Sequence, residues 1–120
     1  MDRTLLNKIE EKIKIRYEKR FAKFNIDPKS LGWLDNESQS ERFNNFIFVL
    51  NKIFSNWHSK KILDFGCGFG NFCEVLINNK FKSKYLGIDC NNDFINFALK
   101  KYNNKNIDFK YGGISKFSKN

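Results

Sequence analysis

The stretch Ile62-Leu63-Asp64-Phe65-Gly66-Cys67-Gly68-Phe69-Gly70 decides the fold of this 120-residue chain. It joins a short hydrophobic strand, with an acid near its end, to three alternate glycines, and residues 71–79 then have the apolar spacing of a helix. Glycine permits a sharp turn and lets a ligand approach the bare backbone. Because open α/β sheets bind ligands at the carboxyl ends of their strands, we expect a ligand at this loop.

Two further strands are predicted after this loop. They cover residues 84–89 and 107–111, and a helix over residues 92–102 lies between them. An alternation of strand and helix requires right-handed crossovers between parallel strands. The second half of the sequence therefore predicts an α/β fold with a parallel sheet of about three strands.

The first half of the sequence predicts two helices. Residues 3–24 have an apolar residue at every fourth position: Leu5, Ile9, Ile13, Tyr17 and Phe21. The Ser38-Gln39-Ser40-Glu41 stretch fits a capping box, so a second helix is expected from Ser38 to about residue 55. We therefore expect a helical lead-in over residues 1–57 and a ligand-binding half-domain over residues 58–120, within one structural domain.

The composition argues against several classes of function. The chain has 22 basic and 13 acidic residues and a net charge of +9, but its lysines are scattered, so nucleic-acid binding is not favoured. No apolar run has the roughly 18 residues of a membrane span, and no signal peptide is recognised. The 3 cysteines form no Cys-x-x-Cys pair, so no metal site is expected and the interpretation is a cytoplasmic protein with reduced thiols.

The spacing of the glycines separates two cofactor classes. Dinucleotide-binding folds use G-x-G-x-x-G, whereas this loop reads G-x-G-x-G and has Asn71 where their last glycine would stand. The carboxylate of Asp64 would repel a pyrophosphate. It can instead hold the amino group of an amino-acid-like ligand.

With these residues, positions 38–114 resemble the class I S-adenosylmethionine-dependent methyltransferases. The resemblance implies a Rossmann-like three-layer parallel sheet, of which the N-terminal half is present after two helices. It implies that the loop from Asp64 to Gly70 wraps the methionine part of the cofactor and that Asp89 accepts both ribose hydroxyls. Cys90 would lie beside the adenine, and Arg42 would reach the cofactor carboxylate. The implied binding set for S-adenosylmethionine or S-adenosylhomocysteine is Arg42, Asp64, Gly66, Cys67, Gly68, Gly70, Asp89, Cys90, Gly113 and Ile114.

The sequence departs from this family in two places. Many members have an Asp after the third strand that bonds the adenine amino group, and Gly113 stands there instead. The chain also ends after about three strands, whereas the family has about seven. The first strand would then be a sheet edge with unpaired backbone groups. We therefore expect a homo-oligomer or a completing subunit.

Two functions remain open at this stage. The first is an enzyme that transfers the methyl group of S-adenosylmethionine to a small-molecule acceptor. The second is a non-catalytic, truncated methyltransferase-like module that binds the cofactor or a partner protein. No catalytic residue is predicted, because His58 precedes the first strand, away from the loop, and Cys67 is interpreted as a small packing residue.

Overall fold

The computed structural model describes residues 3–31 and 36–113. Along the chain its elements are α1 (Arg3–Phe24), the 3-10 turn η1 (Pro28–Leu31), α2 (Asn36–Ile53), the 3-10 turn η2 (Trp57–Ser59), β1 (Ile62–Phe65), α3 (Asn71–Asn78), β2 (Tyr85–Asp89), α4 (Asn92–Lys101) and β3 (Ile107–Tyr111). The predicted helices and strands are all present, with bounds that differ by one or two residues. Such differences are usual at element ends.

The three strands form a parallel sheet in the order β1-β2-β3. Ile62 of β1 pairs with Tyr85 of β2, which pairs with Ile107 of β3. α3 connects β1 to β2, and α4 connects β2 to β3. The predicted fold class, a Rossmann-like parallel sheet preceded by two helices, is confirmed.

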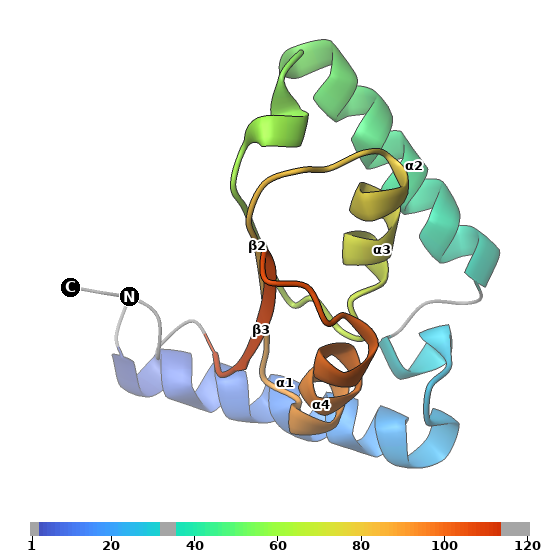
Figure 1. Ribbon diagram of the computed structural model, residues 1–120. Coiled ribbons are helices and arrows are strands. Elements are labelled where there is room, and N and C mark those ends of the chain that lie inside the picture. Colours follow the sequence, from blue (N-terminus) through green and yellow to red (C-terminus); the bar gives the residue numbers. More distant parts are fainter. Residues whose placement is uncertain (1–2, 32–35, 114–120) are drawn as a thin grey trace.

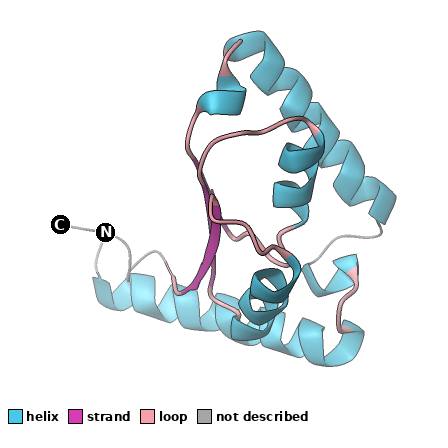
Figure 2. Ribbon diagram, viewed as in Figure 1, coloured by secondary structure: helices cyan, strands magenta, loops and turns pink. Residues whose placement is uncertain are grey.

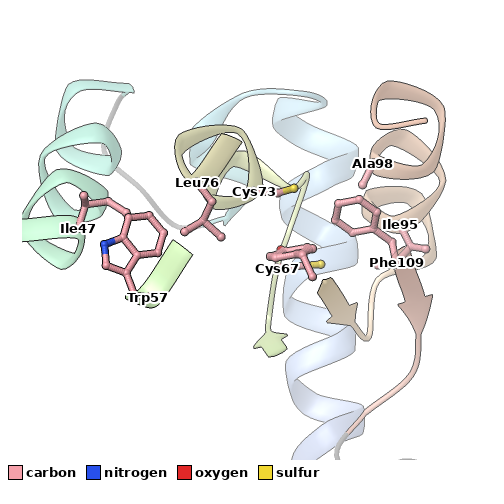
Figure 3. Packing of buried hydrophobic residues seen from close by; sticks show 9 residues of the cluster. Ile47, Trp57, Cys67, Cys73, Leu76, Ile95, Ala98 and Phe109 are labelled. Carbon is pink, nitrogen blue, oxygen red and sulfur yellow. The ribbon is translucent and has the colours of Figure 1, made fainter. Parts of the chain in front are cut away.

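The hydrophobic core lies on one face of the sheet. Figure 2 shows the sheet almost edge-on, with α2, α3 and α4 on one side of it. The buried side chains of this face come from both halves of the chain, and Figure 3 draws them: Ile47, Trp57, Cys67, Cys73, Leu76, Tyr85, Ile95, Ala98 and Phe109. The N-terminal helix α2 is thus part of the same core as the sheet, because Ile47 packs within this cluster.

The opposite face of β1 is exposed. Leu63 and Phe65 alternate with the inward residues of the strand, and their exposed fractions are 54% and 45%. β1 is also an edge strand among the described residues, since only β2 pairs with it. An apolar face beside an unpaired edge is the feature expected from the sequence for the first strand of a three-stranded sheet.

α1 runs past the carboxyl ends of the strands (Figure 1). Its C-terminal half packs on the fold, because the rings of Tyr17 and Phe21 meet Phe94 edge-to-face at centroid distances of 6.2 and 5.8 Å. The apolar positions in the N-terminal half of α1 are not packed in this way. There Ile9 and Ile13 are 40% and 39% exposed, since they face a cavity and not a packed core.

Two details of α2 and the following turn also bear on the predictions. α2 begins at Asn36, so Ser38 lies inside its first turn and the proposed capping box at Ser38 is wrong.

After α2, Trp57 donates from its Nε1 to the Oδ1 of Asn51 at 2.6 Å, and the ring of His58 stacks on Trp57. His58 thus packs on Trp57 before β1, in agreement with the prediction that it lies away from the glycine loop.

Candidate functional site

A cavity of about 740 Å³ opens at the carboxyl ends of β1 and β2. Its floor consists of the strand ends and the glycine loop, and α1 and α2 contribute its walls. The wall residues from the helices are mostly apolar: Leu6, Ile9, Ile13, Tyr17, Phe43, Phe46 and Phe72. The cavity therefore combines a polar floor with apolar walls, which is the usual composition of a small-molecule site.

Asp64 places a carboxylate on the cavity floor near the end of β1. The hydroxyl of Tyr85, on the neighbouring strand, donates to its Oδ2 at 2.6 Å. Burial raises the pKa of Asp64, the Tyr85 hydrogen bond lowers it in part, and the charge of Asp89 raises it further. The result is a partly buried acid that titrates above its ordinary value and is held in one orientation.

Asp89 places a second carboxylate at the end of β2. Its Oδ2 accepts from the amide of Gly68 and its Oδ1 from the amide of Asn91, both at 2.9 Å. Burial raises its pKa, and these amide bonds act in the opposite direction. Asp89 thereby joins the glycine loop to the turn before α4, where Asn91 caps the helix by accepting from the amide of Phe94.

The glycine loop requires its three glycines for backbone reasons. Gly66, Gly68 and Gly70 have φ values of 77, 59 and 84°, in the left-handed region that other residues rarely adopt. The amides of Gly66 and Cys67 both donate to the carbonyl of Ile88, at 2.7 and 3.1 Å. The loop thus folds back over β2 and leaves its backbone surface toward the cavity at Gly66.

Gly66 and Gly70 differ in the atoms that surround them. A methyl group at Gly66 would meet nothing within 4 Å, so the space in front of it is open. At Gly70 a methyl group would stand 2.8 Å from the ring of Tyr102 and 3.0 Å from that of Phe109. The missing side chain of Gly66 therefore leaves open space in the cavity, whereas that of Gly70 lets the loop pack closely on the sheet.

Most of the residues predicted for the site lie in the cavity wall: Arg42, Asp64, Gly66, Cys67, Asp89, Cys90 and Gly113. Gly68 and Gly70 are not among its lining residues, because the first bonds Asp89 and the second packs on β3. Ile114 lies outside the described residues, as do residues 32–35 of the predicted helical lead-in.

Two of the three cysteines, Cys67 and Cys73, have packing positions. Cys67 is 6% exposed, and burial raises the pKa of its thiol, with the charges of Asp89 and Asp64 adding to the effect. Cys73 is 1% exposed, and burial raises its pKa to about 12. Neither thiol is available as a thiolate near neutral pH, in agreement with the packing interpretation of Cys67.

Sequence reasoning missed several cavity residues. Glu10 of α1 lines the cavity, and Tyr85 orients Asp64 from the neighbouring strand. The side chain of Asn71 donates to Gln39 at 2.9 Å and so ties α3 to α2 beside the cavity. Each of these contacts joins segments that are 21 residues or more apart, and no local spacing marks them.

Comparison with known proteins gives the family. A family model described as "Methyltransferase domain" matches residues 56–120, which is more than half of the chain. The chain belongs to this family. Among residues 3–31 and 36–113 of the chain, no helix has the length and apolar character to cross a membrane. No cluster of three or more His, Cys, Asp or Glu side chains in this part of the chain could hold a metal ion.

Individual relatives are similar over different lengths. A fatty-acid O-methyltransferase of Mycolicibacterium smegmatis is 34% identical over 53 residues, 44% of this chain and 19% of the relative. The solved plantazolicin methyltransferase BpumL, in complex with a triazolic desmethylPZN analog and SAH, is 25% identical with a TM-score of 0.50. That match covers 92% of this chain and 45% of BpumL. The methyltransferase domain thus spans about a fifth of the length of its curated relative.

A third likeness is weaker. The methyltransferase in a complex with the Haloferax volcanii Trm112 activator is 16% identical with a TM-score of 0.41. The match covers 57% of this chain and 35% of that protein.

Proposed function

We propose that this methyltransferase domain binds S-adenosylmethionine, or its product S-adenosylhomocysteine, in the cavity at the carboxyl ends of β1 and β2. One observation carries the proposal: two carboxylates, Asp64 and Asp89, flank the open backbone of the glycine loop on one cavity floor. BpumL, which shares the fold, was solved with SAH, and this supports the same ligand class here.

The donor and acceptor chemistry of these residues fits the cofactor. An ionised carboxylate only accepts hydrogen bonds, so Asp64 would hold the ammonium group and Asp89 the two ribose hydroxyls. The open space at Gly66 lets the methionine part lie against the backbone. When bound, S-adenosylmethionine supplies an electrophilic methyl group, and the residues of the cavity contribute binding and orientation.

We further propose that the methyl acceptor is a small apolar molecule that lies between α1 and α2. The walls there consist of Ile9, Ile13, Phe43 and Phe46. Ile13 and Phe46 remain 39% and 51% exposed, so this apolar surface has no packed core against it. The name of the fatty-acid O-methyltransferase is consistent with an acceptor of this kind.

The cofactor proposal is tested by calorimetric titration of the chain with S-adenosylhomocysteine. Asp89→Ala should weaken binding by about 1–3 kcal/mol, since charge-assisted hydrogen bonds are lost. Asp108→Ala, which removes an exposed carboxylate from β3, is the matched control and should bind as the wild type does. Unchanged affinity in Asp89→Ala would remove the ribose assignment, and no binding by the wild type would overturn the proposal.

A second candidate function is a module that binds the cofactor without turnover. It is favoured because none of the three titratable groups of the cavity floor is assigned as a general base. Asp64 and Asp89 are assigned to the cofactor, and burial keeps the Cys67 thiol protonated. The two functions separate in an assay for S-adenosylhomocysteine formed from S-adenosylmethionine, with decanoic acid as the acceptor probe. Formation that depends on the acceptor identifies the enzyme, whereas binding without formation identifies the module.

We also propose that the functional methyltransferase domain has a partner along β1, either a second copy of the chain or a completing subunit. The exposed Leu63 and Phe65 and the unpaired edge of β1 support this.

A further inference from the structure

The side chain of Glu10 occupies the space beside Gly113. A methyl group built on Gly113 would stand 2.6 Å from the carboxyl carbon of Glu10 and 2.7 Å from each of its oxygens. Glu10 and Gly113 are more than 100 positions apart in the sequence and meet because α1 crosses the carboxyl ends of the strands. The absence of a side chain at Gly113 is what leaves room for a carboxylate from α1.

This carboxylate lies at the same cavity as Asp89. The amide of Gly112 donates to the carbonyl of Asp89 at 2.9 Å, which brings the segment after β3 beside the end of β2. Glu10, Asp89, Cys90 and Gly113 all line the cavity. Glu10, Cys90 and Gly113 also line a second, smaller hollow beside this cavity.

We propose that Glu10 supplies the carboxylate that receives the exocyclic amino group of the cofactor's adenine. The inference rests on the proposed function, which assigns Asp89 to the ribose, and on the family resemblance, which implies that the adenine lies beside Cys90. Gly113 lines the same cavity as these two residues. Gly113 cannot contribute a side-chain acceptor, and the group that stands in its place is an acceptor of the same chemistry.

The inference predicts discrimination at one position of the purine ring. A carboxylate accepts a hydrogen bond from the amino group of adenine, but it faces the carbonyl oxygen of hypoxanthine without a donor. The wild type should therefore bind S-adenosylhomocysteine at least about tenfold more tightly than S-inosylhomocysteine, in which an oxygen replaces this amino group.

The experiment is calorimetric titration of both compounds into the wild type, Glu10→Gln and Glu18→Gln. A glutamine amide both donates and accepts, so Glu10→Gln should bring the affinity ratio close to one. Glu18→Gln makes the same charge change at an exposed position of α1 and should keep the wild-type ratio. Gly113→Ala is a second variant, because its methyl group would displace the Glu10 carboxylate and should lower the ratio as well.

The outcomes separate this inference from the proposed function. Binding of S-adenosylhomocysteine with an unchanged ratio in Glu10→Gln and Gly113→Ala would overturn the role of Glu10 and leave the cofactor site intact. Failure of the wild type to bind S-adenosylhomocysteine would overturn the proposed function, and the role of Glu10 with it.

Discussion

At the scale of single residues, Asp64 has the most informative environment. Its carboxylate accepts from Tyr85, and burial raises its pKa above the ordinary value of 3.8. Ionisation of Asp64 therefore costs more in the folded chain than in the unfolded one. Its contribution to stability is largest below pH 3.8 and decreases as the pH rises through the folded-state pKa. A partly buried acid whose pKa is raised in this way is typical of a ligand-binding site.

Binding of S-adenosylhomocysteine should have the opposite pH dependence. If the ionised Asp64 holds the ammonium group, affinity should fall as the pH is lowered through the raised pKa of this acid. Tyr85→Phe removes a hydrogen bond that lowers this pKa, so the loss should begin at a higher pH. Calorimetric titrations from neutral pH down to the ordinary value of 3.8 measure both effects.

Two variants serve as controls for this pH dependence. Asp93→Asn changes an exposed acid of α4 and should keep the wild-type profile. Asp64→Asn should bind weakly at all pH values and lack the transition. A profile of Asp64→Asn that coincides with the wild type would exclude Asp64 as the group responsible.

At the scale of elements, the loop between β1 and α3 performs three tasks, one with each of its glycines. Its first glycine, Gly66, faces the cavity, and its last, Gly70, allows the rings of Tyr102 and Phe109 to approach the backbone. Its middle glycine, Gly68, donates to Asp89 and so links the ends of the two strands. A ligand at this loop would therefore meet a rigid surface, already hydrogen-bonded within the protein.

Alanine at the two outer glycines should separate these tasks. Gly66→Ala strains a left-handed residue by roughly 1–2 kcal/mol but meets no atom, so the protein should fold and bind S-adenosylhomocysteine more weakly. Gly70→Ala adds contacts below 3.0 Å with Tyr102 and should lower the free energy of unfolding by more. Urea denaturation and calorimetric titration measure the two effects, and full affinity in Gly66→Ala would exclude close contact at this glycine.

At the scale of the whole molecule, the distribution of apolar surface is uneven. One face of the sheet has a closed core built by α2, α3 and α4 (Figure 3). The other face presents Leu63 and Phe65 beside an unpaired strand edge. An exposed apolar edge strand is a site where further chains can add, which is why the proposed partner is placed at this face.

Self-association along β1 should depend on Leu63. Light scattering of the wild type should give a mass above 14.3 kDa, and Leu63→Lys should bring the mass back to this value, because a charge is placed on the apolar face. Leu99→Lys, at a 46% exposed position of α4, is the matched control and should keep the wild-type mass. A monomeric wild type would contradict pairing of two copies and leave a completing subunit as the partner.

The sequence by itself determined the elements and their order. The apolar periodicity of α3 and α4, the alternate glycines and the acid at each strand end are local signals, and the handedness of crossovers then fixes a parallel sheet. Asp64, Gly66 and Asp89 could be predicted as cavity residues for the same reason, since each stands at the end of a strand or in the loop that follows it.

Only the tertiary structure decided how the helices of the first half complete the cavity. Nothing in the spacing of α1 indicates that Ile9 and Ile13 would face a cavity, or that Glu10 would lie against Gly113. The bond from Tyr85 to Asp64 likewise joins two strands whose register is set by the whole sheet. The apolar period of an element predicts which of its faces is buried, but it does not predict which distant segment packs on that face.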